Sequence, residues 1–252
     1  MTSRVPLRTR LAEAQLALML LTRLPAGQLP SPAPTIPQAA WAFPLAGLAV
    51  GALAALILWA ALAVLPASIA AGLALAAMML ATGALHEDGL ADIADGFGGG
   101  RDRARKLEIM RDSRIGSYGT LALIVSVGLR WQLIAALASP AALIAAAVLS
   151  RAGLPAVMAL VPPARADGMG RLASGPARAV ALAAVALGLA AAALLTGPLL
   201  ALICAAAVAV TLFTLSHIAA RQIGGQTGDV LGAMQQISEM AVLMVLVSVA
   251  RV

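Results

Sequence analysis

The chain has 252 residues, of which 62% are hydrophobic and 11% are charged, and its mean hydropathy is +0.96. Because about a quarter of the residues of a soluble domain are charged, this composition excludes an ordinary soluble protein and indicates an integral membrane protein. The net charge of +6 would suit nucleic acid, but the basic residues cluster beside long apolar runs, where they orient spans and contact lipid headgroups. We therefore expect membrane lipid, and no nucleic acid, as a partner.

The first predicted element covers residues 8–23, which are basic at both ends and too short to span a membrane comfortably. This pattern favours an interfacial amphipathic helix, with a buried helix as the alternative. Apolar segments follow, each close to the ~20 residues that a helix needs to cross a bilayer. They are predicted over residues 40–64, 68–86, 118–138, 140–162, 178–196, 198–217 and 231–250. The expected fold class is all-α: a polytopic integral membrane helical bundle with about seven transmembrane helices, in a single membrane domain over residues 1–252.

The basic residues predict the orientation of this bundle. Three of the links between spans contain no lysine or arginine, whereas the segments over 87–117, 163–177 and 218–230 are basic. Since basic loops favour the cytoplasmic side of a membrane, these three loops are expected to share the cytoplasmic face. Arg165 is interpreted as one of the orientation charges.

Carboxylates gather in one short stretch, because seven of the 11 acidic residues lie between Glu87 and Asp112. Asp88, Asp92 and Asp95 have the spacing i, i+4, i+7, which puts them on one face of a helix. Mg²⁺ prefers carboxylate oxygens and leaves other positions for water and substrate phosphate. The spacing therefore predicts a Mg²⁺ site formed by these three aspartates, with Glu87 as a further ligand or a base. A solvated acidic face paired with nearby arginines is the alternative.

Glycines and then basic residues follow the acidic stretch, in "GFGGGRDRARKLEIMRDSRIGSYG". The glycines would let the backbone approach a ligand, and the guanidinium groups suit phosphate oxygens. The start of a helix near Tyr118 would also favour an anion. Acids, a metal and a basic loop together indicate phosphoryl transfer. We predict a cytoplasmic active-site loop over about 86–117.

A second polar segment, "GGQTGDVLGAMQQISE", precedes and enters the last span. Its Asp229 either caps that span or belongs to the site. Arg130, Arg151 and Glu239 lie within spans, where charges are costly unless they are paired or line a polar cavity. Mutual pairing and contact with a large polar ligand both remain open for these three residues. His86 either forms a hydrogen bond to the site or simply packs in the interior, and the sequence favours neither role.

These motifs allow a family to be named. "HEDGLADIADGFGGG", followed by "LEIMRDSRIGSYG" and later "GGQTGDVLGA", resembles the cobalamin synthase family, the adenosylcobinamide-GDP ribazoletransferases of bacterial cobamide assembly. The resemblance is most specific over residues 85–120 and 221–239. It implies a multi-pass, Mg²⁺-dependent enzyme of the bacterial inner (cytoplasmic) membrane, with its active site facing the cytoplasm. It also implies that a corrinoid nucleotide donor, adenosylcobinamide-GDP, is joined to α-ribazole or its 5′-phosphate, with release of GMP.

The resemblance further implies roles for individual residues. Asp88 and Asp92 would hold Mg²⁺ against the diphosphate, Asp95 and Glu87 would complete the metal site, and one of these carboxylates would accept the hydroxyl proton. Arg111, Ser113 and Arg114 would bind phosphate oxygens, and Asp112 would orient the two arginines. The second polar segment would contact a nucleotide or the corrinoid through Gly225, Thr227 and Asp229.

Two other functions compete with this interpretation. CDP-alcohol phosphotransferases, which make phospholipids, also use helical aspartates for Mg²⁺, with the signature Asp-Gly-x2-Ala-Arg-x8-Gly-x3-Asp-x3-Asp. Asp88 and Gly89 begin similarly, but Asp92 follows at once and no Ala-Arg pair appears. A cation transporter would place acids across the depth of the membrane, whereas here they gather at one mouth. The sequence leaves open whether the protein forms a homo-oligomer.

Overall fold

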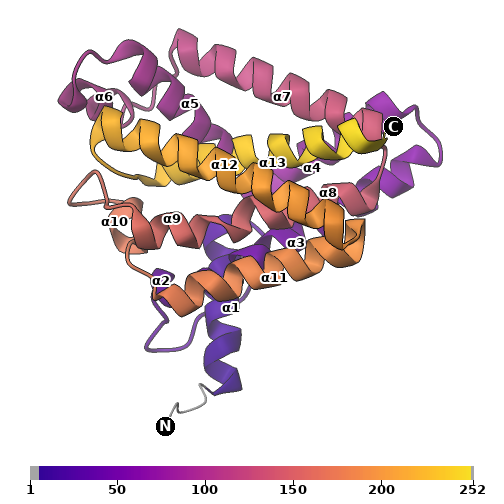
Figure 1. The fold of residues 1–252 in the computed structure, drawn as a ribbon, viewed down its shortest axis with the longest axis horizontal. Coiled ribbons are helices and arrows are strands. Elements are labelled where there is room, and N and C mark those ends of the chain that lie inside the picture. Colours follow the sequence, from indigo (N-terminus) through magenta and orange to yellow (C-terminus); the bar gives the residue numbers. More distant parts are fainter. Residues whose placement is uncertain (1–5, 251–252) are drawn as a thin grey trace.

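The computed structural model describes residues 6–250, and within them the chain forms helices and no β-strand (Figure 1). The all-α prediction is therefore confirmed. The helices are α1 (Leu7–Leu21), α2 (Ile36–Ala39), the 3₁₀ helix η1 (Ala40–Ala42), α3 (Phe43–Leu62), α4 (Ala67–Thr82), α5 (Leu85–Gly99), α6 (Arg103–Ile109), α7 (Ser117–Leu137), α8 (Pro140–Ala152), α9 (Leu154–Leu160), α10 (Met169–Ala173), α11 (Arg178–Thr196), α12 (Pro198–Ile223) and α13 (Gly228–Ala250).

The number of spans agrees with the sequence prediction. Within the described residues, six helical segments are long and apolar enough to cross a membrane, or seven if the bent pair of α4 and α5 counts as one span. One of the six is formed by α2, η1 and α3 together, and another by α8 and α9 together. These six to seven segments agree with the expected number of about seven transmembrane helices.

The bend between α4 and α5 was not predicted. The axes of the two helices meet at 86°, because Gly83 and Ala84 both adopt left-handed backbone, with φ of 63° and 56°. For an alanine this conformation costs roughly 1–2 kcal/mol. The chain therefore turns sharply within the predicted span over 68–86, whose last two residues already belong to α5, and α5 carries the carboxylates across the direction of α4.

The predicted loop over about 86–117 is mostly helical. All the glycines of "GFGGG" except Gly100 lie in the last turn of α5, and α6 follows, so only the short segments 100–102 and 110–116 are irregular. Tight packing explains these glycines, because a Cβ on Gly96 would lie 2.5 Å from the Met110 side chain and one on Gly98 would lie 2.7 Å from the Tyr118 ring.

Small residues allow the central helices to pack closely. A Cβ on Gly47 of α3 would lie 2.3 Å from the carbonyl oxygen of Ala147 in α8, so the two backbones approach as they do at small-residue contacts in membranes. The α8–α9 pair and α13 are mostly buried, with 72% and 67% of their most apolar stretch inside the protein. For α7, α11 and α12 the values are only 17–22%, so these helices present apolar side chains outward, α7 and α11 at opposite edges of the bundle in Figure 1.

The three basic loops meet at one end of the bundle, as predicted. Arg103 Nη2 donates to the Ala164 carbonyl at 2.8 Å, and Arg165 Nη2 donates to the Leu107 carbonyl at 3.0 Å. The Ala164 amide in turn donates to the Gln226 carbonyl at 2.8 Å. Segments that are far apart in the sequence therefore form one polar end.

The first helix, α1, has its outer end projecting from the bundle in Figure 1. Its buried Glu13 accepts hydrogen bonds from Arg10 Nη1 at 2.7 Å and from Trp41 Nε1 at 2.6 Å. The helix predicted over residues 8–23 is therefore present and is joined to the rest of the protein at its inner turns; its place at a membrane surface stays a prediction.

Candidate active site

The predicted acidic and basic site residues line one cleft of about 450 Å³ at the polar end. Helix α5 forms one wall and the irregular segment 110–116 forms the other. The predicted residues that line the cleft are Glu87, Asp88, Asp92, Arg111, Asp112, Ser113 and Arg114. Carboxylates opposite guanidinium groups can hold a cation and a phosphate group side by side.

Asp88 and Asp92 face this cleft with unbalanced negative charge. Asp88 is exposed and Asp92 is half-buried. The charge on Asp92 is opposed by those of Asp229, Asp88 and Asp95, and the only cation that offsets them appreciably within residues 6–250 is Arg165. A divalent cation at this position would remove the repulsion, which makes the pair the strongest candidate for holding a metal.

Asp95, the third member of the predicted stripe, is hydrogen-bonded at both oxygens. Its Oδ2 accepts from the Gly116 amide at 2.7 Å and its Oδ1 accepts from the Gly119 amide at 2.8 Å. These amides belong to the N-terminus of α7, where unpaired N–H groups favour an anion. Asp95 therefore caps α7 and occupies the anion site expected there for a substrate, and we do not carry it forward as a metal ligand.

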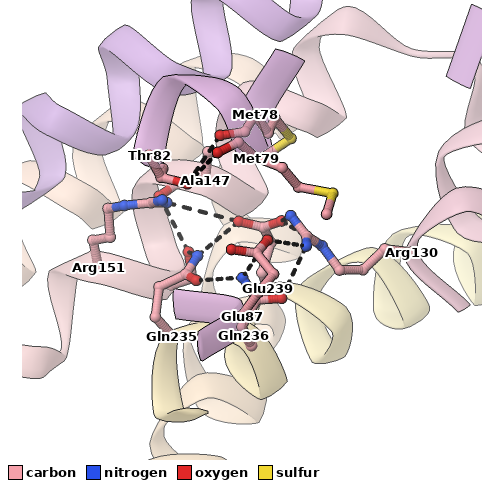
Figure 2. Close-up of polar contacts among 11 residues, drawn as sticks. Met78, Met79, Thr82, Glu87, Arg130, Ala147, Arg151, Gln235, Gln236 and Glu239 are labelled. Carbon is pink, nitrogen blue, oxygen red and sulfur yellow. Dashed lines mark hydrogen bonds and ion pairs between the residues drawn. The ribbon is translucent and has the colours of Figure 1, made fainter. Parts of the chain in front are cut away.

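Glu87 lines the cleft, but one of its carboxylate oxygens is paired within the interior of the bundle. Its Oε1 accepts from Arg130 Nη1 at 2.7 Å and from Gln236 Nε2 at 3.1 Å, and the side chains of Glu87 and Arg130 are almost completely buried. Figure 2 shows Glu87 within a cluster of polar side chains. This pairing suits Glu87 to positioning α5, next to Asp88. Its Oε2 has no hydrogen-bond partner within residues 6–250, so the ligand and base roles stay predictions.

The buried cluster continues to the other charges within the spans. Glu239 Oε1 accepts from Arg130 Nη2 at 2.7 Å, and Glu239 Oε2 lies 3.7 Å from Arg151 Nη1 and accepts from Gln235 Nε2 at 2.7 Å (Figure 2). Two arginines thus balance two glutamates among α5, α7, α8 and α13. The question left open by the sequence is settled in favour of mutual pairing, as expected for charges at this depth.

The segment 110–116 forms the basic wall of the cleft, and its two arginines are held by acidic partners. Asp112 Oδ2 accepts from Arg114 Nη2 at 2.7 Å, and this bond lowers the pKa of Asp112 to about 2, so the pair stays ionised at neutral pH. Arg111 Nη2 instead donates to both oxygens of Asp167, at 2.6 and 2.8 Å. Both arginines are exposed, so their remaining N–H groups are available to a ligand in the cleft.

Asp229 lies beside the aspartate pair and is not the cap of its helix. The Thr227 hydroxyl takes that role, because its Oγ1 accepts from the Val230 amide at 3.2 Å. The Asp229 carboxylate lies 3.9 Å from Arg165 Nη1 and is close enough to Asp88 to be opposed by its charge. Asp229 and Arg165 therefore extend the site, although Arg165 was interpreted only as an orientation charge.

The segment around Gly225 is closely packed. Gly225, Gln226 and Thr227 are buried, the Gln226 amide donates to the Pro162 carbonyl at 2.9 Å, and a Cβ on Gly225 would lie 2.1 Å from that carbonyl oxygen. These contacts give Gly225 and Thr227 structural roles. Of the three residues of this segment that were predicted to bind substrate, only Asp229 remains a candidate for substrate contact.

Gly89 brings α5 against the start of α13. A Cβ at this position would lie 2.8 Å from the backbone oxygen of Asp229 and 3.1 Å from its Cα. We expect Gly89→Ala to separate the two helices, to destabilise the protein by about 1–3 kcal/mol and to lower activity by about tenfold or more by displacing the aspartates. Gly128→Ala is the control, because a Cβ at Gly128 would have no neighbouring atom within 4 Å. Thermal unfolding and turnover of both variants test this, and equal behaviour would contradict it.

The residues at the cleft fit Mg²⁺ that is shared with water and substrate, and they do not fit a metal whose ligands all come from the protein. In the part of the chain that the structure describes, no group of three or more His, Cys, Asp or Glu side chains is arranged to hold a metal ion. Mg²⁺ typically uses one or two carboxylates and takes its other ligands from water and substrate phosphate. Asp88 and Asp92, with arginines across the cleft, match that donor set.

Fold and site together define a polytopic helical membrane protein with an acidic and basic cleft at one end. The family model described as cobalamin-5-phosphate synthase matches residues 13–247, and the chain belongs to this family. Relatives called adenosylcobinamide-GDP ribazoletransferase include one from Bradyrhizobium diazoefficiens, 50% identical over 95% of this chain and 94% of its own. A second relative, from Mesorhizobium japonicum, is 46% identical over 94% of this chain and 93% of its own. A third, from Shewanella amazonensis, is 40% identical over 92% of this chain and 93% of its own. No solved structure matches the chain.

Proposed function

We propose that this protein joins adenosylcobinamide-GDP to α-ribazole or its 5′-phosphate, with release of GMP. The observation that carries the proposal is the cleft, in which Asp88 and Asp92 face Arg111 and Arg114. The names of relatives that match nearly the whole chain support the same reaction. A phospholipid-forming phosphotransferase is not favoured, because neither the family match nor these relatives point to it.

In this reaction a ribose hydroxyl of the acceptor attacks the phosphorus attached to the aminopropanol arm of the corrinoid. A new P–O bond forms, the bond from that phosphorus to the bridging oxygen breaks, and GMP leaves with the bridging oxygen and its electron pair. The hydroxyl proton passes to the carboxylate of Asp88 or Asp92. Arg111 and Arg114 bind phosphate oxygens on which charge develops.

Asp88 and Asp92 would hold Mg²⁺, which when bound would neutralise oxygens of the diphosphate. Ser113 adds a hydroxyl to the basic wall, and Asp112 keeps Arg114 directed along that wall. We place the cleft on the cytoplasmic side of the bacterial inner membrane, because the basic loops lie at this end of the bundle.

The test uses purified protein in detergent or proteoliposomes. With adenosylcobinamide-GDP, α-ribazole and Mg²⁺, we expect GMP and the joined corrinoid in equal amounts. EDTA should stop GMP release, and excess Mg²⁺ should restore it. Turnover of CDP-diacylglycerol in place of the corrinoid donor would overturn the proposal, and undiminished activity in EDTA would overturn the metal assignment.

A further inference from the structure

A second cavity shares Asp88 with the cleft described above, which we call the phosphate cleft. It has a volume of about 270 Å³ and lies among α1, α3, α5, α9, α10 and α13. Its walls are mainly apolar, with contributions from Leu21, Phe43, Leu154, Met158 and Leu231. A mainly apolar cavity with few polar groups is typical of a site for a small organic ligand.

His86 is the polar group in this wall whose own contacts are incomplete. Its side chain is only 2% exposed and lines the cavity. Neither ring nitrogen, Nδ1 or Nε2, has a hydrogen-bond partner within residues 6–250. A buried imidazole without a partner is costly unless a ligand supplies one, and a neutral imidazole offers one donor and one acceptor.

Asp88 lines both the second cavity and the phosphate cleft. Asp229 lines the second cavity too, so two carboxylates belong to its wall. A molecule with an apolar aromatic end and a hydroxyl-bearing end could fill the cavity and present a hydroxyl to Asp88. The phosphate cleft differs in that Arg111 and Arg114 line it.

We propose that the cavity beside His86 binds the nucleoside acceptor, with the aromatic base against the apolar wall and the ribose toward Asp88. The inference rests on the proposed function and adds to it the place of the second substrate. His86 donates a hydrogen bond to the base or accepts one from it. Asp88 stands between acceptor and donor, where it can receive the hydroxyl proton.

Two neighbouring residues of α9 provide a matched test. Leu154 lines the proposed acceptor cavity, whereas Val157 lines a separate apolar groove among α8, α9, α11 and α12, and both are buried. Leu154→Trp should raise the KM for α-ribazole by about tenfold or more, since added groups in an apolar pocket change affinity on this scale. The KM for adenosylcobinamide-GDP should stay within twofold, and Val157→Trp should change neither value.

Direct binding separates this inference from the proposed reaction. Equilibrium dialysis of α-ribazole against protein without donor should show binding to the unchanged protein and to Val157→Trp, and weaker binding to Leu154→Trp. His86→Phe, which keeps an aromatic ring, should also weaken binding, and His86→Gln should restore part of it. Equal binding by Leu154→Trp and Val157→Trp would overturn the cavity assignment even if the protein releases GMP. Absence of GMP release from the unchanged protein would instead overturn the proposed function.

Discussion

Asp88→Asn and Asp92→Asn should each lower the rate of GMP release by about 10³-fold, the scale of losing one strong electrostatic contact to a transition state. Each substitution keeps the size of the side chain and removes one negative charge from the cleft that both residues line. The Mg²⁺ concentration for half-maximal activity should rise for both variants, because carboxylate oxygens are the ligands that Mg²⁺ prefers. Steady-state rates across a Mg²⁺ titration measure both effects.

Stability distinguishes this catalytic role from a structural one. Since the charge of Asp92 is opposed by three neighbouring carboxylates, Asp92→Asn should leave the unfolding temperature in detergent unchanged or raise it. Glu108→Gln is the control, because Glu108 is an exposed carboxylate of α6 that pairs with Arg105 and it should retain full activity and stability. A stability loss in Asp92→Asn that parallels its activity loss would contradict the assignment.

Hydropathy and helical spacing predicted the parts of the fold that depend on neighbours in the sequence. The spans follow from apolar runs, and the i, i+4, i+7 spacing placed Asp88 and Asp92 on a helix that lines a cleft with Arg111 and Arg114. Local patterns could not show the bend at Gly83 and Ala84. An alanine with left-handed backbone breaks the local rules and is held there by its surroundings.

The roles of several polar residues depended on contacts between distant segments. The spacing of Asp95 predicts a third ligand, but α7 folds back and presents two amides to it. The sequence around Arg165 predicts an orientation charge, but the pairing of Pro163 with Gln226 brings its loop to Asp229. The signal available for Asp229 itself was its place in the glycine-rich segment before the last span, which left capping and site roles equally open.

Arg130→Met should cause the largest loss of stability. Arg130 contacts both Glu87 and Glu239, and all three side chains are almost completely buried. Removing the arginine leaves two buried carboxylates with Arg151, whose Nη1 lies 3.7 Å from Glu239. Breaking a buried ion pair in this way costs about 3–5 kcal/mol, so the unfolding temperature in detergent should fall sharply. Arg178→Met, at an exposed position on α11, should have no such effect.

The double variant Arg130→Met/Glu87→Gln tests whether charge balance is the cause. It removes one positive and one negative charge and leaves Glu239 with Arg151 and Gln235. Much of the stability lost in Arg130→Met should return, because contacting residues in one network are not additive. The activity of the restored protein then reports on Glu87 directly. If Glu87 only positions α5, the double variant should turn over at a rate within about tenfold of the unchanged protein. If the stable double variant loses as much turnover as Asp88→Asn does, Glu87 takes part in the reaction itself.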